Sequence, residues 1–141
     1  MITIRKAIPS DAKELMKLNT IFNGENSTTL EKMENMLHTN KDEIVYVASY
    51  NEILVGFSCA YIMRSACYSY NYGEVTELFV LKEYRKKGIG RKLLQHTENE
   101  LSEHGVTHIH MLTHSSNIVA QSLYHSCGYT DTSEILLDKN I

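Results

Sequence analysis

The sequence predicts a single domain of the α/β (α+β) class, in which helices cover a mixed β-sheet. Length is the first observation behind this prediction, because 141 residues suffice for one hydrophobic core but hardly for two. The second observation is the pattern of apolar residues, which switches between the period of a strand and the spacing of a helix. Strands and helices that alternate in this way form a sheet with helices packed against it. We therefore expect one domain over residues 1–141.

The N-terminal segment predicts a strand followed by a helix. Apolar and polar side chains alternate over residues 2–7, as they do in a half-buried strand. Pro9 and Ser10 then indicate the start of a helix, with Ser10 as its N-cap. One face of this helix carries an apolar stripe, made by Leu15, Leu18 and Phe22.

A second helix and a hairpin are predicted next. The capping-box pattern of residues 28–31 starts the helix, which ends near Asn40. Two β-rich segments follow at residues 43–50 and 53–63. Only residues 51–52 separate them, so we expect a tight hairpin.

The middle of the chain predicts a third long strand, a turn and a long helix. Residues 65–73 are rich in tyrosine and loop-like at both ends, and residues 74–81 form the strand. A basic turn over residues 82–90 leads into the helix, which ends at Gly105. The side of the helix that faces the core comprises Leu93, Leu94, Thr97 and Leu101.

The C-terminal segment predicts a strand, a short helix and a last strand. The first strand covers residues 106–113. Ser115 or Ser116 caps the short helix, and Gly128 ends it. Residues 129–138 contain the final predicted strand.

Composition excludes several classes of protein. The chain has 14 Lys and Arg against 17 Asp and Glu, so its net charge of −3 argues against a nucleic-acid partner. No apolar run approaches the ~18–20 residues of a membrane helix, and the N-terminus lacks the pattern of a signal peptide. The three cysteines show no paired spacing, which is typical of reduced thiols. We expect a cytoplasmic protein that binds neither nucleic acid nor membranes.

The basic turn predicts an anion site. Arg85–Gly90 reads Arg-Lys-Lys-Gly-Ile-Gly and stands between a predicted strand and a predicted helix. A helix N-terminus offers unpaired N–H groups and a partial positive charge, and glycine lets the backbone approach a phosphate closely. The pattern fits neither a Walker A loop nor the dinucleotide fingerprint. The alternative interpretation is a solvated basic turn.

A second pattern lies on the short C-terminal helix. Ala120, Leu123 and Cys127 share one of its faces, and Ala120 is small enough for a ligand or a backbone to come close. Tyr124 stands one position further round, so its hydroxyl can reach the edge of a cleft. The alternative for Tyr124 is an ordinary amphipathic contact.

Together the two patterns resemble the GNAT family of N-acetyltransferases over nearly the whole chain. The first motif is Val80-x-x-x-x-Arg85-x-x-Gly88-x-Gly90, and the second comprises Asn117, Ala120, Leu123, Tyr124, Gly128 and Tyr129. The resemblance implies a mixed, mostly antiparallel sheet of six to seven strands with about four helices. It also implies that the fourth and fifth strands splay apart.

The resemblance implies acetyl-CoA as the cosubstrate. The main chain of the fourth strand would hold its pantetheine arm, and backbone N–H groups of residues 86–91 would bind its pyrophosphate. Asn117 would contact the pantetheine arm or hold the wall of the cleft. The implied cofactor-binding residues are Leu78, Phe79, Val80, Arg85, Lys86, Lys87, Gly88, Ile89, Gly90, Arg91, Asn117 and Tyr124.

The resemblance also implies catalytic roles. Tyr124 would give a proton to the leaving thiolate, and the backbone N–H of Val80 would stabilise the oxyanion. The base would be Glu77 or Glu74; Glu74 stands where histone-type members of the family carry a base. In an ideal strand the two glutamates face opposite sides, unless a bulge reorients Glu77. The alternative for each is a solvated charge at the edge of the sheet.

Two further groups of side chains are weaker indications of function. His104, His108, His110 and His114 lack the spacing of a metal site, so we expect no metal. The tyrosines just before the fourth strand would suit a cationic amine or a dimer contact, or would simply pack on the sheet. These tyrosines are Tyr61, Tyr68, Tyr70 and Tyr72.

The sequence thus predicts an enzyme that moves an acetyl group directly from acetyl-CoA to a primary amine. The expected acceptor is a small molecule such as a polyamine, an aminoglycoside-like sugar amine or an amino-acid-type amine. The family's ribosomal-protein enzymes carry a glutamate where this chain has Leu112, which counts against that class of acceptor. The alternatives are a peptide or protein acceptor, and a non-catalytic sensor of acyl-CoA on the same fold. The resemblance also allows a homodimer.

Overall fold

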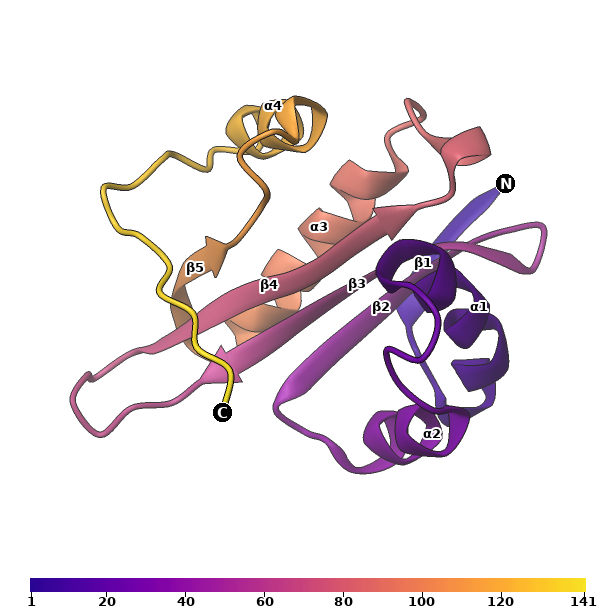
Figure 1. The fold of residues 1–141 in the computed structure, drawn as a ribbon, viewed down its shortest axis with the longest axis horizontal. Helices are drawn as coiled ribbons and strands as arrows, with labels where there is room; N and C mark the ends of the chain where they lie inside the picture. Colours follow the sequence, from indigo (N-terminus) through magenta and orange to yellow (C-terminus); the bar gives the residue numbers. More distant parts are fainter.

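The computed structural model describes residues 1–141 and shows a five-stranded sheet with four α-helices (Figure 1). The strands are β1 (Ile2–Lys6), β2 (Glu43–Tyr50), β3 (Ile53–Met63), β4 (Asn71–Val80) and β5 (Val106–Met111). They lie in sequence order; β1 to β4 are antiparallel, and β5 is parallel to β4. This topology confirms the predicted mixed, mostly antiparallel sheet.

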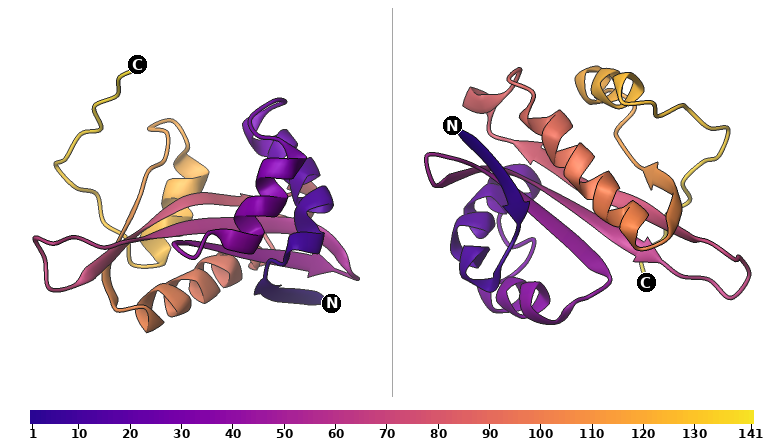
Figure 2. Two further views of the ribbon diagram at one scale, coloured as in Figure 1. Left: turned by 90° about the horizontal axis from the view of Figure 1, so that it is seen from below. Right: turned by 180° about the vertical axis from the view of Figure 1, so that it is seen from behind.

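The helices cover both faces of the sheet. They are α1 (Ala12–Asn23), α2 (Leu30–Thr39), α3 (Ile89–Glu103) and α4 (Ile118–Ser126). Helices α1 and α2 lie on one face, and α3 lies on the other (Figure 2). Helix α4 follows β5 beyond the edge of the sheet (Figure 1). No helix combines the length and the apolar composition needed to cross a membrane.

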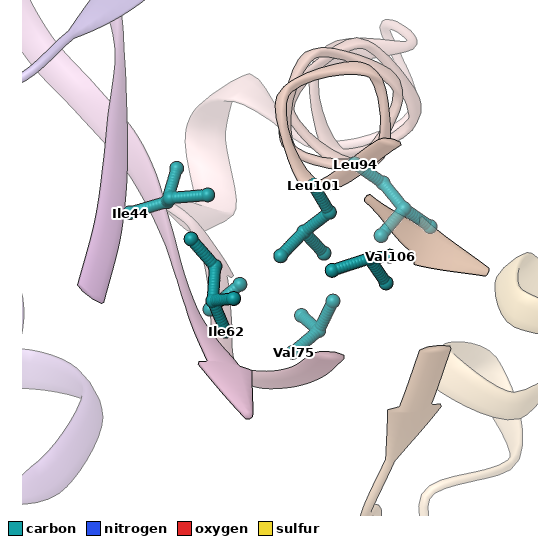
Figure 3. Packing of buried hydrophobic residues seen from close by; sticks show 7 residues of the cluster. Ile44, Ile62, Val75, Leu94, Leu101 and Val106 are labelled. Atoms are coloured by element: carbon teal, nitrogen blue, oxygen red, sulfur yellow. The ribbon is translucent and has the colours of Figure 1, made fainter. Parts of the chain in front are cut away.

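The core lies on both sides of the sheet. Figure 3 shows side chains of α3 meeting those of β2 to β5, and its labelled residues are Ile44, Ile62, Val75, Leu94, Leu101 and Val106. The predicted inner side of α3 is confirmed, because Leu93, Leu94, Thr97 and Leu101 are all fully buried. On the opposite face, Leu15 and Leu18 of α1 pack with Phe57 and Phe79. Burying one such leucine contributes about 1.5–3 kcal/mol.

Strands β4 and β5 separate halfway along β4. They pair only from Asn71 to Val75 of β4, so residues 76–80 have no partner strand on that side. This geometry confirms the predicted splay between the fourth and fifth strands. The second half of β4 therefore presents an open edge.

A bulge in β4 determines which way Glu77 points. Cys59 of β3 stands opposite Glu77, and the next residue, Ala60, stands opposite Val75. Thr76 is therefore an extra residue that shifts the alternation of β4 by one. As a result Glu77 lies on the α1–α2 face together with Phe79, whereas Val75 faces α3.

The predicted last strand, and with it the count of six to seven strands, is wrong. Residues 130–141 form no strand, and Ile135, Leu136 and Leu137 are largely exposed. A strand needs the hydrogen-bonding groups of a neighbour as well as a suitable local sequence. No backbone hydrogen bond of this segment reaches β5, whose outer edge stays unpaired.

Two predicted N-caps are also wrong. Ser10 does not cap α1, because it lies within the 3₁₀ turn Pro9–Asp11. Asp11 directly precedes α1 but gives no side-chain cap. Its carboxylate instead accepts hydrogen bonds from Arg5 and from the Ile8 N–H. In α4 the cap is Asn117, whose Oδ1 accepts from the Ala120 N–H at 3.2 Å.

Most other local predictions are confirmed. Helix α2 starts at Leu30 as predicted, but its N-cap is Thr29, which accepts from the Lys32 N–H, so the capping box predicted over residues 28–31 does not form. Gly105 follows α3 with a φ of +78°. The 51–52 turn joins β2 and β3 as a tight hairpin, with positive φ at both residues, as a type I′ turn requires.

Candidate functional site

The open half of β4, the N-terminus of α3 and helix α4 enclose a cavity of about 770 Å³, here called the β4–α4 cavity. Of the twelve predicted cofactor-binding residues, all but Lys87 line it. The eleven are Leu78, Phe79, Val80, Arg85, Lys86, Gly88, Ile89, Gly90, Arg91, Asn117 and Tyr124. The structure therefore brings together, around one space, two motifs that lie about thirty residues apart in the sequence.

The basic turn presents unpaired backbone N–H groups to this cavity. The first helical hydrogen bond of α3 runs from the Lys92 N–H to the Gly88 carbonyl oxygen. The N–H groups of residues 86–91 have no acceptor within the chain. Gly88 adopts a φ of +80°, which glycine tolerates, and nothing lies within 4 Å of the place a Cβ would take. The turn is thus an open concavity of N–H donors at a helix N-terminus, which favours an anion.

The two arginines of this region have structural partners of their own. The Arg85 Nε donates to the Val80 carbonyl oxygen at 2.7 Å, so Arg85 holds the end of β4. The Arg91 guanidinium donates to Ser126 Oγ at 2.6 Å and contacts Cys127 Sγ at 3.3 Å. Arg91 therefore ties α3 to α4 and sets the width of the cavity between them.

The main chain of β4 points into the open edge at two positions. The Leu81 N–H donates to the Val55 carbonyl oxygen at 2.8 Å, so it faces β3. Backbone direction alternates along a strand, so the N–H groups of Leu78 and Val80 face away from β3. These N–H groups meet no partner strand there, because β5 has already separated.

Helix α4 supplies a tyrosine to the same cavity. Asn117 caps α4, which fixes the first turn of the helix against the wall. About two turns after Asn117, Tyr124 lines the cavity and packs edge-on to Tyr129, with 6.3 Å between ring centroids. The Tyr124 hydroxyl has no hydrogen-bond partner in the chain, and burial raises its pKa. A tyrosine with a raised pKa stays protonated at neutral pH and is able to donate.

A second cavity, of about 480 Å³, lies between the α1–α2 pair and the sheet, and is here called the α1–α2 cavity. Its floor carries Glu43, Val45, Phe57, Cys59, Tyr61 and Glu77, and its roof includes Leu15, Asn19, Asn23, Lys32, Met33, Met36 and Leu37. Glu77 accepts a long hydrogen bond of 3.4 Å from Asn23 Nδ2. Burial raises the pKa of Glu77, and the Asn23 hydrogen bond opposes this rise in part.

The linings of the two cavities adjoin at the C-terminal end of α1. Phe22 lines the β4–α4 cavity, and the next residue, Asn23, lines the α1–α2 cavity. The Phe22 ring stacks on Phe79 with centroids 5.0 Å apart. On β4 the same change occurs between Glu77 and Leu78. Glu77 therefore stands at the junction, beside the start of the open edge.

The other candidate residues lie elsewhere. Glu74 lines neither of these two cavities. The predicted tyrosine group divides, because Tyr61 lies in the α1–α2 cavity while the other three are packed beside the histidines of β5. Their ring-centroid distances are 5.4 Å for Tyr68–Tyr70, 6.1 Å for Tyr70–His108 and 5.8 Å for Tyr72–His110. No three metal-ligating side chains gather at one place.

Sequence reasoning missed two residues of the site. Phe22 reads as part of the apolar stripe of α1, yet it lies at the cavity mouth and is 41% exposed. Glu43 was not singled out, although its period-two alignment with Val45 and Val47 places it on an inward face. Burial, and then the charge of Glu77, raises the pKa of Glu43.

The comparisons with known proteins agree with this geometry. The model of the Acetyltransferase (GNAT) family matches residues 12–129. An uncharacterized N-acetyltransferase of Chlorobaculum tepidum is 32% identical over 121 residues, which is 86% of this chain and 74% of that protein. Spermidine N(1)-acetyltransferase of Thermoplasma acidophilum is 28% identical over 105 residues, which is 72% of this chain and 62% of that protein.

A shorter match and a solved structure add to these. The [Ribosomal protein bS18]-alanine N-acetyltransferase of Escherichia coli is 35% identical over 51 residues, which is 36% of this chain and 34% of that protein. The crystal structure of an aminoglycoside acetyltransferase from an uncultured soil metagenomic sample, in complex with trehalose, has a TM-score of 0.86. It is 19% identical and covers 99% of this chain and 95% of its own, which shows a shared fold.

Proposed function

Because the chain belongs to the GNAT family and is an acetyl-CoA-dependent N-acetyltransferase, we propose that its acceptor is the primary amine of a small molecule and that acetyl transfer is direct. The observation that carries the proposal is that the linings of the two cavities adjoin beside Glu77. One cavity offers anion-binding N–H groups, and the other offers carboxylates. A thioester and an amine bound in the two cavities would face each other across the junction.

The residues of the β4–α4 cavity fit acetyl-CoA. The six unpaired N–H groups of residues 86–91 would bind its pyrophosphate, and the open space at Gly88 allows close approach. The outward N–H groups of Leu78 and Val80 would hold the pantetheine amides, as a neighbouring strand would. Acetyl-CoA supplies the acetyl group as a thioester, so the transfer forms a C–N bond and breaks a C–S bond.

Glu77 would act as the base. An amine attacks only when neutral, whereas a typical alkylammonium with a pKa near 10 is mostly protonated at neutral pH. The Glu77 carboxylate lies at the junction, and burial raises its pKa toward the range in which a carboxylate accepts protons effectively. Glu77 would take the ammonium proton, directly or through one water. Glu74, the other candidate, lines neither cavity.

Val80 and Tyr124 would stabilise the two negative charges that develop in the reaction, one on the oxyanion and one on the leaving thiolate. The Val80 N–H points into the open edge and would donate to the oxygen that becomes negative at the reacting carbon. Tyr124 has a free hydroxyl and would give its proton to the leaving thiolate. A phenol of pKa near 10 is protonated at neutral pH and can donate, but it is a weaker acid than a thiol of pKa near 8.5, so the transfer is slightly uphill and solvent would return the proton to Tyr124.

The α1–α2 cavity supports a small acceptor rather than a protein. A volume of about 480 Å³ lies within the range of small-molecule sites. Helices α1 and α2 cover this face of the sheet (Figure 2), and residues of both helices line the cavity. The relative that acts on spermidine is of the same small-molecule kind.

Two measurements on one sample test the proposal. Acetyl-CoA should raise the Tm, because a ligand that binds only the folded state stabilises it. A panel of polyamines, sugar amines and amino acids should then include an amine that releases free thiol, with the N-acetylated product identified by mass spectrometry. Release with a peptide N-terminus alone would contradict the small acceptor. A Tm shift without release from any amine would contradict direct transfer and favour a sensor.

A further inference from the structure

The α1–α2 cavity holds two carboxylates at a fixed separation. Glu43 enters from β2 opposite Tyr61, and Glu77 enters from β4 opposite Cys59. Both line the cavity, so both belong to the face that α1 and α2 cover. Two strand spacings and two residues along the strand separate their Cα atoms by about 12 Å. The two carboxylates therefore come from the strands on either side of β3.

Neither carboxylate has a cationic partner in the chain. The ion pairs of the chain use Asp11, Asp42, Glu100 and Asp131 instead. Lys32 is the only cationic residue that lines the cavity. Lys32 is exposed, and it forms no ion pair with Glu43 or Glu77. Burial of unpaired carboxylates is unfavourable unless a ligand supplies the counter-charge.

Eight of the fifteen residues that line the cavity are hydrophobic. Met33, Met36 and Leu37 of α2 face Val45 and Phe57 of the sheet across the cavity. Such a surface suits methylene groups. The one cation of the lining, Lys32, is exposed and comes from α2. The cavity thus combines two carboxylates with apolar surface, and it also carries the polar side chains of Asn19, Asn23, Ser27 and Thr28.

We propose that this cavity selects an aliphatic diamine, with Glu77 at the amine that is acetylated and Glu43 at the second ammonium group. Glu43 is then a specificity-determining residue that acts on acceptor choice and takes no part in proton transfer. This inference rests on the proposed function, because it assigns the α1–α2 cavity to the acceptor. Glu43 would thus bind the second ammonium group of the acceptor, while Glu77 takes the proton of the amine that is acetylated.

The test compares 1,4-diaminobutane with n-butylamine, which has the same carbon chain and lacks the second nitrogen. Binding to the protein saturated with CoA is measured by calorimetry, and kcat/KM is measured by thiol release. Wild type should prefer the diamine by about 10- to 100-fold, the range for a hydrogen bond to a charged group. Glu43→Gln should reduce this ratio to within about threefold of unity, mainly through KM. The matched control Glu34→Gln removes one charge from the exposed side of α2 and should keep the wild-type ratio.

The outcomes separate this inference from the proposed function. Equal binding of the two amines to wild type would overturn the inference without any variant. A wild-type ratio that persists in Glu43→Gln would also overturn it. Diamine binding that depends on Glu43 but gives no thiol release would support the inference about selectivity and contradict the proposed function. Far-ultraviolet circular dichroism of Glu43→Gln establishes that a lost ratio does not reflect a lost fold.

Discussion

Replacing Glu77 by glutamine removes the proposed base with almost no change of volume. The glutamine side chain retains an oxygen that can accept the Asn23 hydrogen bond of 3.4 Å, so the end of α1 should stay in place. Glu77 lies outside the β4–α4 cavity, so the variant should bind acetyl-CoA as wild type does. General-base catalysis contributes about 10²- to 10⁴-fold, so kcat/KM for the amine should fall by that factor.

The pH dependence of Glu77→Gln has a defined sign. Only the carboxylate accepts a proton, so wild-type kcat/KM should rise with pH through the pKa of Glu77, which burial holds above the ordinary value. The variant should lack this rise, and Glu43→Gln should keep it. Because the folded state binds this proton more tightly than the unfolded chain, the free energy of unfolding falls as pH rises from the ordinary carboxyl pKa to the raised one. The variant should therefore exceed wild type in Tm at pH 7, and the difference should shrink at pH 4.

Three assays check this reasoning: stopped-flow thiol release from pH 5 to 9, calorimetric titration with CoA, and thermal denaturation at pH 4 and pH 7. A variant with wild-type kcat/KM would remove Glu77 from the mechanism. Retention of the acidic limb of the pH profile in Glu77→Gln would assign that limb to another group. Loss of CoA binding would mean that the two cavities are not separate at Glu77.

Three other variants test the remaining parts of the structure. Tyr124→Phe removes a hydroxyl without a hydrogen-bond partner, so it should keep the Tm shift with acetyl-CoA and lower kcat by about 10²- to 10⁴-fold; unchanged kcat would exclude it as the acid. Gly56→Ala puts a Cβ 2.8 Å from the Phe79 carbonyl oxygen, and overpacking of about 1–3 kcal/mol in a chain of this length lowers the Tm by about 3–10 °C in a thermal melt. Arg91→Ala loses the 2.6 Å hydrogen bond to Ser126, so amide hydrogen exchange in α4 should become about tenfold faster while α3 stays protected.

The open turn with its unpaired N–H groups was predictable because its physics is local. Gly88 and the basic residues before it lie between a strand and a helix, and that order alone places N–H donors at a helix start. Helix α3 was predictable for the same reason, since its apolar spacing leaves one side for the core. The final strand was not predictable, because residues 129–138 have strand-like composition but pairing depends on an edge elsewhere in the fold.

The sequence could not decide which face of the sheet the Glu77 side chain would occupy. Period-two alternation predicts that Glu74 and Glu77 face opposite sides, and it holds only while each residue has one partner. The bulge opposite Cys59 breaks this condition, and no residue type near Thr76 signals it. Glu43, in contrast, was within reach of the sequence, because β2 keeps its alternation from Glu43 to Val47.

The bulge at Thr76 explains how one strand can serve both cavities. Without the extra residue, Glu77 would follow Val75 onto the α3 face, where Val75 packs with Leu94 and Leu101 and no cation is present. A carboxylate there would be buried without a partner, at a cost that a domain of marginal stability cannot offset. With the bulge, the side chain of Glu77 turns to the α1–α2 cavity while the N–H of Val80 stays directed to the open edge. The base and the oxyanion donor of the proposed reaction thus come from the same short stretch of β4, and the bulge that left the direction of Glu77 open in the sequence is what turns it toward the α1–α2 cavity.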